Sequence, residues 1–311
     1  MGQAPPVAVG TRDRVVRRSH RACRSFTIGI AMAVALPTHA AQAQRATPIG
    51  AIACRAGALA ASAPALPWAG DAALKWAAWP IALGPGRVAV RVIVVDIDPA
   101  RVALSLDLAR DGNNVLPWSL DVAPDDALLA MNAGQFTDDG PWGWVVHRGR
   151  EWQAPGRGPL SGAFAVNSSG RVTIGDTGQL DSLRRAGGLR EALQSFPLVL
   201  QNGRPPQLLC TPTSALDRTH RDIRLAVGVR ADGHVIIALS RYDGVGSVAE
   251  RLPIGPTTME MAEIMRRLGA RDALMLDGGL SAQLLLREGG KVHRWEGLRR
   301  VPLALIGRSS P

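Results

Sequence analysis

The sequence predicts an α+β fold: a strand-rich single domain with mixed sheets and a few helices. Most apolar segments are short and alternate with polar residues, as residues 88–94 do, which is the spacing of half-buried strands. Only residues 257–268 have clear helical spacing. Because strands and helices do not alternate regularly along the chain, the pattern differs from that of a doubly wound parallel sheet.

The predicted strands begin near residue 88 and are separated by turns that carry glycine, asparagine or proline. Residues 88–94 and 101–108 form two strands joined at Asp98-Pro99. Hairpins are predicted where a short polar turn separates two apolar segments. They cover residues 143–150, 162–174 and 225–239, and single buried strands cover residues 128–131 and 197–200.

Two helices are expected. Thr257 is the predicted N-cap of the first, with Glu260 three residues later, and Gly269 follows its C-terminal end. These end signals support a helix over residues 257–268. Residues 181–195 have a weaker helical pattern and are predicted to form the second helix.

The first 43 residues have the order of a secretory signal peptide. Six arginines within residues 12–24 precede an apolar stretch, residues 26–36, and Ala41-Gln42-Ala43 fits a cleavage site. The stretch is too short for a comfortable transmembrane helix. We therefore expect a periplasmic or secreted protein that meets the membrane only through its export signal.

The formal net charge of +10 does not indicate a nucleic-acid partner. Residues 1–43 hold six arginines against one aspartate and therefore contribute +5 of that charge. Charges of both signs are scattered over the remaining residues, without basic patches interleaved with aromatic residues. We therefore expect no nucleic acid among the partners.

The mature chain is predicted to hold a short docked segment followed by one domain. Residues 44–85 are rich in alanine, proline and tryptophan and have little periodicity, whereas residues 86–311 carry the regular pattern. Cys54 and Cys210 remain after cleavage. In an oxidising compartment they could form a disulfide, but we slightly favour two unpaired buried thiols. No C-x-x-C motif or His/Cys cluster indicates zinc.

Candidate site residues lie where four apolar segments meet polar or glycine-bearing turns. Glycine lets backbone N–H groups approach the oxygens of a phosphate or carboxylate closely. We predict that the four segments share one pocket. The alternatives are turn-capping asparagines, a structural ion pair for the arginine and an ordinary Asp-Gly turn. The residues are Asn132, Gly134 and Gln135 in the first segment, Asn202 in the second, Arg224 in the third, and Asp277, Gly278, Gly279 and Ser281 in the fourth.

In this order and spacing, the four segments resemble the phosphodiester glycosidase family. That family includes the lysosomal "uncovering" enzyme and many bacterial exopolysaccharide-associated proteins. The resemblance extends from about Arg87 to Gly307. The sequence departs from the family at Leu280, where many relatives carry glycine or serine. It also has Ile223-Arg224-Leu225 in place of Pro-Arg-Thr, which keeps the arginine but loses a neighbouring hydroxyl.

The resemblance implies an exported hydrolase that cleaves the glycosidic C–O bond of a sugar-1-phosphodiester in a glycan or glycoconjugate. Arg224 suits the phosphate because its planar guanidinium can donate to two oxygens at once. Backbone N–H groups of Gly278, Gly279 or Gly134 could hold a third oxygen. The partner implied is a carbohydrate or glycosyl phosphate. The sequence identifies no cofactor and leaves a divalent metal ion open.

Asp277 has two alternative roles: nucleophile or base at the anomeric carbon, or ligand for sugar hydroxyls. Glycoside hydrolysis normally uses two carboxylates, and the candidates for the second are Asp138, Asp139 and Glu260. Two other functions use the same pocket. One is a non-catalytic carbohydrate-binding or envelope-assembly protein, and the other is a phosphoesterase that cleaves P–O instead of C–O.

Overall fold

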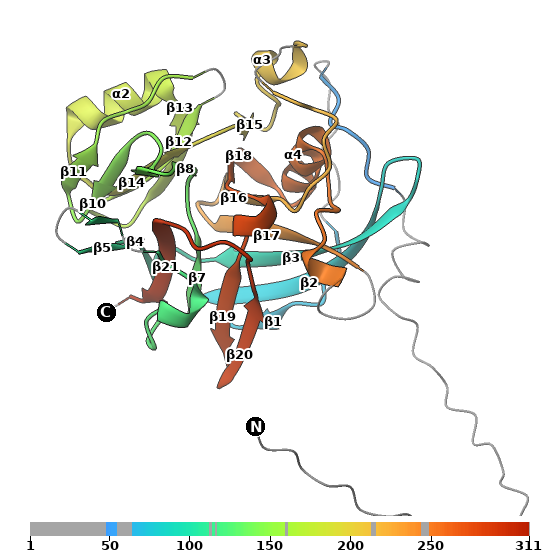
Figure 1. The fold of residues 1–311 in the computed structure, drawn as a ribbon, viewed down its shortest axis with the longest axis horizontal. Helices are drawn as coiled ribbons and strands as arrows, with labels where there is room; N and C mark the ends of the chain where they lie inside the picture. The colour runs from blue at the N-terminus through green and yellow to red at the C-terminus, as the bar shows by residue number, and fades with distance from the viewer. Residues whose placement is uncertain are drawn as a thin grey trace, which may run out of the picture. The chain divides into compact units, whose positions relative to one another are not determined.

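Antiparallel sheets build most of the protein, and the prediction of a strand-rich α+β fold with a few helices is confirmed (Figure 1). This computed structural model describes residues 48–54, 64–111, 114–115, 117–158, 161–212, 216–243 and 249–310. All of them belong to one unit, residues 37–311. Every paired strand among the described residues runs antiparallel, and the parallel contact between Ile49 and Leu83 is an isolated bridge.

A seven-stranded sheet runs through the middle of the fold. Its spatial order is β1-β2-β3-β17-β16-β18-β15, so strands distant in the sequence become neighbours. The strands are β1 (Ala69–Gly70), β2 (Leu74–Leu83), β3 (Val88–Ile97), β15 (Leu198–Leu200), β16 (Leu225–Arg230), β17 (Val235–Tyr242) and β18 (Ala270–Leu276).

Two five-stranded sheets and two short hairpins complete the strands. The first sheet comprises β20 (Lys291–Trp295), β19 (Leu284–Glu288), β7 (Leu129–Asn132), β21 (Leu303–Ser309) and β4 (Val102–Leu108) in spatial order. The second comprises β11 (Arg150–Gln153), β10 (Val145–His147), β14 (Leu189–Ser195), β12 (Gly162–Asn167) and β13 (Val172–Asp176). The short pairs are β5 (Arg110–Asp111) with β6 (Asn114–Val115), and β8 (Phe136–Thr137) with β9 (Gly140–Pro141).

The helix predicted over residues 257–268 is confirmed as α4 (Thr258–Arg267). Thr257 caps it, and the side chain of Glu260 accepts from the Thr257 backbone N–H in return, which completes a capping box. Two further α-helices are described, α2 (Thr177–Ala186) and α3 (Gln207–Cys210). The 3₁₀ turns are η1 (Leu120–Val122), η2 (Ala249–Arg251) and η3 (Gly279–Ser281).

The helix predicted over residues 181–195 is wrong in its second half. Helix α2 begins earlier, where the Asp176 side chain accepts from the N–H of Gln179, and it ends at Gly187-Gly188. Both glycines have positive φ values, 70° and 72°, which a continuing right-handed helix cannot accommodate. The following apolar residues form β14.

The central sheet is buried on both faces because successive side chains of β3 point to opposite sides. Ile93 and Val95 pack with β4 and β7 in one core, whereas Val92 and Val94 pack with Met261 and other α4 residues in another. Full burial of such side chains contributes about 1.5–3 kcal/mol each. Both cores therefore fix the position and register of β16 and β18, which lie in the same sheet.

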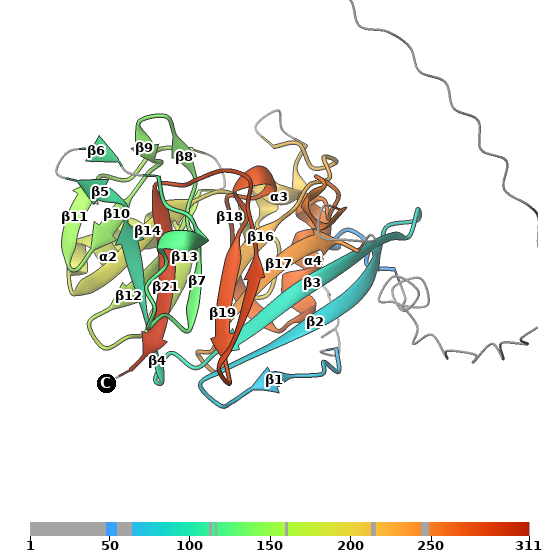
Figure 2. The same cartoon turned by 60° about the horizontal axis from the view of Figure 1, so that its bottom comes forward.

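The sheet includes residues that the sequence analysis assigned to a separate segment, residues 44–85. Strand β2 pairs with β3 over ten residues, from Leu74 opposite Ile97 to Leu83 opposite Val88, and Figure 2 shows the two strands side by side. The alternation of β2 is hidden because its burial is irregular: its buried residues do not recur every second position.

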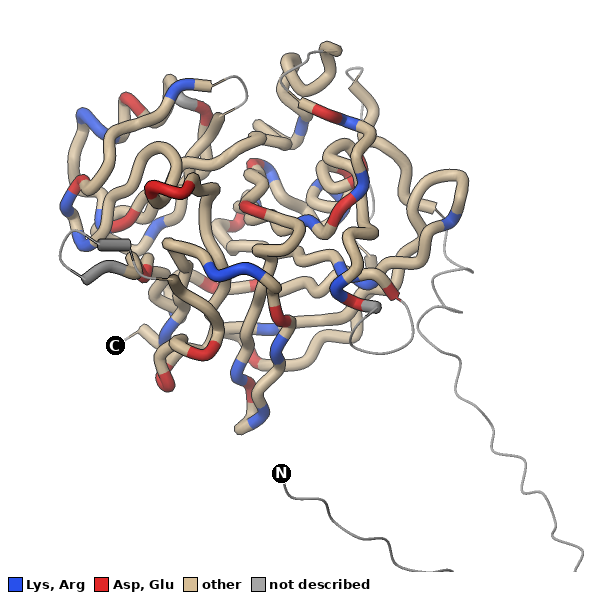
Figure 3. Tube along the Cα trace, viewed as in Figure 1, with Lys and Arg blue, Asp and Glu red and all other residues tan. Residues whose placement is uncertain are grey.

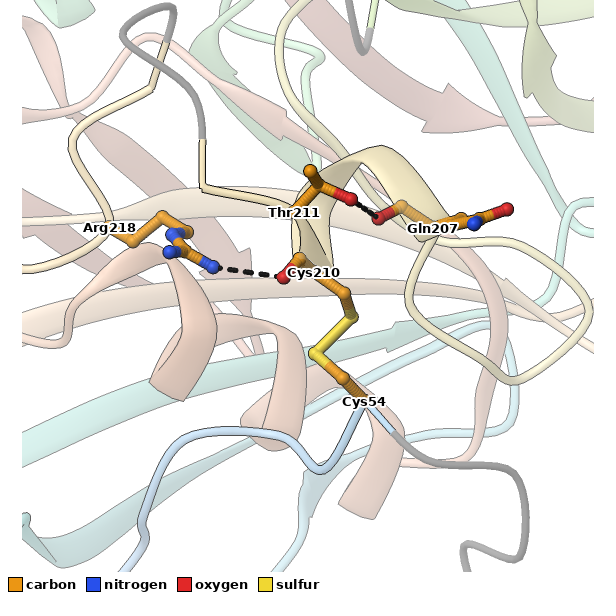
Figure 4. The surroundings of a disulfide bond; sticks show 5 residues. All are labelled: Cys54, Gln207, Cys210, Thr211 and Arg218. Atoms are coloured by element: carbon orange, nitrogen blue, oxygen red, sulfur yellow. Dashed lines mark hydrogen bonds between the residues drawn. A yellow bond between two sulfur atoms is a disulfide. The ribbon is translucent and has the colours of Figure 1, made fainter.

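Cys54 and Cys210 form a disulfide, with Cα atoms 5.7 Å apart (Figure 4). The slight preference for unpaired thiols was therefore wrong. The 156-residue separation gave no hint of proximity, which arises because α3 lies over the segment that contains Cys54. The predicted signal peptide, residues 1–43, lies outside the described residues. None of the described helices is long and apolar enough to cross a bilayer.

Candidate functional site

A cavity of about 480 Å³ opens where β16 begins and β18 ends. That volume lies within the range of small-molecule sites. Segments from widely separated parts of the chain form its wall. The lining residues are Gln135, Phe196, Pro197, Leu216, Asp217, His220, Asp222, Arg224, Thr258, Met275, Leu276, Asp277, Gly278, Gly279, Leu280, Ser281 and Arg299.

The pairing of β16 with β18 brings Arg224 and Asp277 to one end of the sheet. Leu225 lies opposite Leu276 at the last rung of the ladder, so the next residues outward are Arg224 on one strand and Asp277 on the other. Opposite positions of an antiparallel pair place their side chains on the same face. Both side chains line the cavity.

Two glycines allow the Asp277 turn to pack closely against the start of β16. A Cβ on Gly278 would collide with the carbonyl oxygen of Ile223, and a Cβ on Gly279 would lie 2.9 Å from Asp222 Oδ2. Gly279 also has a φ of 53°, and its N–H donates to the Ile223 carbonyl at 2.8 Å. The turn needs glycine at both positions for close packing.

This packing corrects the predicted use of the Gly279 N–H group. That N–H donates to the Ile223 carbonyl and is therefore not left for a phosphate oxygen. The glycines instead shape the turn that carries Asp277.

Asn132 and Gly134 lie behind the cavity and position the same turn. Asn132 is fully buried; its Nδ2 donates to the Asp277 carbonyl at 2.8 Å, and its Oδ1 accepts from the Gln283 N–H at 2.9 Å. The carbonyl of Gly134 accepts from the Asp277 N–H at 3.2 Å. Both sides of the Asp277 peptide are therefore held by the end of β7 and the turn after it. Gln135 lines the cavity itself and donates to the Phe196 carbonyl at 2.7 Å.

Asn202 lies at the other end of β18, so the prediction of one pocket for all four segments is corrected. Its backbone N–H donates to Asp272 Oδ1 at 2.8 Å. Asp272 is five residues before Asp277, which corresponds to about 17 Å along a strand. The reason is strand direction: β15 runs antiparallel to β18, so its C-terminal end meets the beginning of β18.

Burial dominates the electrostatics of Asp277. Its partly buried position raises the pKa of the carboxyl group above the ordinary value, and the negative charge of Asp222 raises it further. A hydrogen bond from Ser281, the positive charge of Arg299 and the N–H of Gly278 act in the opposite direction. Among the described residues, no cation lies within ion-pair distance of this carboxylate.

Arg224 keeps hydrogen-bonding capacity free toward the cavity. Its Nε donates to the Pro256 carbonyl at 3.3 Å and its Nη2 to the His220 carbonyl at 2.9 Å. Within the described residues, Nη1 has no hydrogen bond and the guanidinium has no carboxylate partner. Burial lowers the pKa of Arg224, and the charges of Asp222 and Asp217 oppose that shift. The group remains a cation at neutral pH.

Asp222 is the second acidic residue near Asp277, and the sequence analysis missed it. Its carboxylate lies against Gly279, accepts from the Ile223 N–H at 2.7 Å and is 3.7 Å from His220 Nε2. A usable signal was present: Asp222 and Arg224 are two residues apart in an extended segment, which places their side chains on one side.

The three acids that the sequence analysis considered for this role lie elsewhere. Glu260 is paired with Arg221 at 2.7 and 2.8 Å and serves the α4 cap. Asp138 and Asp139 are exposed in the turn between β8 and β9 and do not line the cavity. Nor do the described residues include a group of three or more His, Cys, Asp or Glu arranged to hold a metal ion, so we name no metal ligands.

Arg299 is a further cavity residue without a sequence signal. It follows β20 in a loop whose backbone is bonded to the Asp277 turn: the N–H groups of Leu298 and Arg299 donate to the Leu280 carbonyl at 2.7 and 3.0 Å. The guanidinium is more than half exposed and lies over the ring of Phe136. Figure 3 shows that acidic and basic residues are interspersed along the described trace.

Residues 125–306 match the sequence pattern of the phosphodiester glycosidase family, over more than half of the chain. The protein belongs to that family. The matched region contains every residue that lines the cavity, whereas β1 to β6 precede it. The resemblance stated from the four sequence segments is confirmed.

Solved structures of other proteins have a similar fold. It is similar to the catalytic domain of zebrafish N-acetylglucosamine-1-phosphodiester alpha-N-acetylglucosaminidase, auto-inhibited by its pro-peptide, with a TM-score of 0.60 and 17% identity over 81% of this chain and 87% of that chain. It is also similar to a hypothetical protein from Synechocystis, with a TM-score of 0.50 and 18% identity over 79% of this chain and 64% of that one. No curated protein matches the sequence. At these identities the structural likeness concerns the fold.

Proposed function

We propose that the protein is an exported hydrolase that cleaves the glycosidic C–O bond of a sugar-1-phosphodiester. The observation that carries the proposal is the junction of two segments on one cavity. The start of β16 supplies Asp222 and Arg224, and the turn after β18 supplies Asp277. Two acids and a cation that has no carboxylate partner among the described residues are the groups that this reaction needs, and the family membership supports the same chemistry.

In this proposal the two acids act at the anomeric carbon. One carboxylate acts as the nucleophile or the base that removes a proton from water, and the other stabilises the positive charge that develops on the sugar. In the overall reaction, a water oxygen becomes bonded to the anomeric carbon while the bond from that carbon to the phosphate oxygen breaks. The products are the free sugar and a phosphate monoester.

The leaving group explains why cations matter more than a strong general acid. A phosphate monoester has a second pKa near 6, so it departs with little protonation. Arg224 and Arg299 supply the positive charge that the departing phosphate needs, and Arg224 keeps Nη1 available for it. A guanidinium suits this role because its planar geometry matches two phosphate oxygens.

Two observations support export. The first 43 residues have the composition of a signal peptide, and the Cys54–Cys210 disulfide is of the kind that persists in oxidising compartments. N-terminal sequencing of the protein from its native host tests the point. We expect a mature chain that begins near residue 44, and a cytoplasmic chain that retains Met1 would contradict export.

Hydrolysis in ¹⁸O-labelled water tests the reaction. The protein with its disulfide intact is incubated with a panel of sugar-1-phosphodiesters that differ in the sugar. We expect the label in the released sugar, because water attacks carbon. Label in the phosphate product would identify a phosphoesterase instead. Calorimetric binding of the same compounds without turnover would identify a non-catalytic carbohydrate-binding protein.

A further inference from the structure

Two cavities share a wall, and one arginine belongs to both. The second cavity, of about 210 Å³, is lined by Arg299, which also lines the cavity that contains Asp277. Gln135 lines the first cavity, and the next residue, Phe136, lines the second. A molecule that is too long for the first cavity would therefore extend across Arg299 into the second.

The second cavity carries more positive than negative charge. Arg299 and Arg300 line it together with one acid, Asp138. Asp138 Oδ1 is 3.7 Å from Arg299 Nη2, and its side chain is fully exposed, so this pairing is weak. Arg300 is exposed and has no ion pair or hydrogen bond among the residues that the structure describes.

Apolar ring faces accompany these charges. Phe136 lies under the Arg299 guanidinium, which is 4.7 Å from the ring centre, and Pro117 and Pro302 are also lining residues. Flat apolar surfaces of this kind pack against the C–H faces of sugar rings, while guanidinium groups bind carboxylates and phosphates. The combination therefore fits a sugar ring that carries an anionic group.

The loop that carries both arginines is held firmly in place. Arg241 is buried, and its Nη2 donates to the carbonyls of Ala282, Trp295 and Glu296 at 2.8, 3.2 and 3.1 Å. Beyond the arginines, Val301 exchanges two backbone hydrogen bonds with Trp118, at 2.7 and 2.9 Å. The loop is thus fixed to the Asp277 turn on one side and to residue 118 on the other. The second cavity is formed before any ligand arrives.

We propose that this second cavity binds the group on the far side of the phosphodiester, and that this group is an anionic sugar such as a hexuronate. The inference rests on the proposed hydrolase function. A phosphodiester lies between its sugar and its aglycone, and Arg299 is the cation that lies between the two cavities. The cleaved sugar then occupies the cavity of Asp277, the phosphate meets Arg299, and the carboxylate of the aglycone meets Arg300.

Arg300→Gln tests the subsite, because this substitution removes one charge from a side chain without partners in the described structure. Arg185→Gln, at an exposed arginine in the last turn of α2, is the matched control. Three diesters of one sugar serve as substrates, with a methyl, a neutral hexose and a hexuronate aglycone.

We expect the wild type to have the highest kcat/KM for the hexuronate. Arg300→Gln should lower that value about fivefold and leave the methyl diester unchanged. Arg300→Glu should lower it further.

Several outcomes would overturn the subsite. One is equal kcat/KM values for the hexuronate and the hexose diesters in the wild type. Another is a loss of kcat/KM in Arg300→Gln that is equal for all three diesters. The third is a loss of kcat/KM for the hexuronate diester in Arg185→Gln as large as that in Arg300→Gln. If the wild type hydrolyses none of the diesters, calorimetry with methyl phosphate and a phosphorylated hexuronate decides. If Arg300→Gln binds only the phosphorylated hexuronate more weakly than the wild type does, the subsite is supported although the hydrolase proposal fails. If Arg300→Gln binds both compounds as the wild type does, the subsite is contradicted.

Discussion

The two ends of β18 carry similar residues but have different surroundings. At the beginning of the strand, Asp272 is buried and both of its oxygens have partners: Oδ1 accepts from the Asn202 N–H and Oδ2 from Arg271 Nε, each at 2.8 Å. At the other end, Asp277 lines a cavity without a cation at ion-pair distance among the described residues. The first end is a completed structural contact.

The surroundings of the two aspartates distinguish a candidate site from a structural contact, whereas their residue types do not. Each end has an aspartate, an arginine and a glycine-bearing turn. Of the two ends, only the Asp277 end combines an acid and an arginine that line a cavity and have no ion-pair partner among the described residues. Groups with perturbed protonation and unused partners are the ones available to a substrate.

Replacement of each aspartate by asparagine should produce the largest contrast between the two ends. We expect Asp277→Asn to lower kcat by at least about 100-fold, because it removes the negative charge next to the anomeric carbon. Substrate binding, measured by calorimetry, should persist. If Asp277 only holds sugar hydroxyls, KM should rise while kcat survives.

Asp272→Asn is the control for that experiment. It weakens a buried hydrogen-bonded carboxylate, so the free energy of unfolding should fall by about 1 kcal/mol while kcat stays unchanged. Denaturant unfolding and steady-state kinetics measure the two effects. Equal losses of kcat in both variants would show that the two ends do not differ in function.

Arginine replacement should give the next largest contrast. Arg224→Lys keeps the charge but loses the planar group that donates to two oxygens, so we expect kcat/KM to fall about 10- to 100-fold. Arg271→Lys changes an arginine at the other end of β18 that is already paired with Asp272, and its kcat/KM should remain that of the wild type. A normal kcat/KM in Arg224→Lys would show that the Arg224 guanidinium does not bind the phosphate.

Glycine replacement compares the packing of the two turns. Gly279→Ala combines a φ of 53° with a Cβ position 2.9 Å from Asp222 Oδ2. We expect a loss of about 2 kcal/mol in unfolding free energy, together with reduced kcat because Asp222 must shift. Gly203→Ala has a similar φ of 74° but open space around the new Cβ, so its loss should be about 1 kcal/mol with normal kcat. Equal behaviour of the two variants would mean that the Asp222 contact is unimportant.

The parts of the fold that could be predicted from sequence are those that short segments determine. The α4 cap depends on residues three positions apart, and the β12–β13 and β16–β17 hairpins depend on turns between neighbouring strands. The cysteine pair depends instead on a contact between distant segments, which no local pattern encodes. Strand β2 pairs with its neighbour β3 across a short turn, but its irregular burial hides the alternation that would identify it as a strand.

The candidate site shows the same division. Arg224 and Asp277 could be brought together in advance because each lies next to a strand end with a recognisable turn. Asn202 has the same local pattern, but the direction of β15 places it at the opposite end of β18. Arg299 could not be found from sequence, since its position depends on hydrogen bonds from a loop to the Leu280 carbonyl.

The smallest effect concerns the pH dependence of stability at the Asp277 end. Burial raises the pKa of Asp277 in the folded protein above its value in the unfolded chain. The folded state therefore binds this proton more tightly, so the contribution of Asp277 to stability is most favourable below the unfolded pKa. That contribution is lost as the pH rises through the folded pKa. Asp277→Asn removes the titrating group, so its unfolding free energy relative to the wild type should increase as the pH rises from the unfolded pKa through the folded pKa and should then level off. Denaturant unfolding across this range measures the difference, with Asp272→Asn as the reference for loss of an aspartate elsewhere on the strand. A difference between Asp277→Asn and wild type that stays constant with pH would show that burial does not shift this carboxyl group, and the contrast between the two ends of β18 would then rest on the cavity alone.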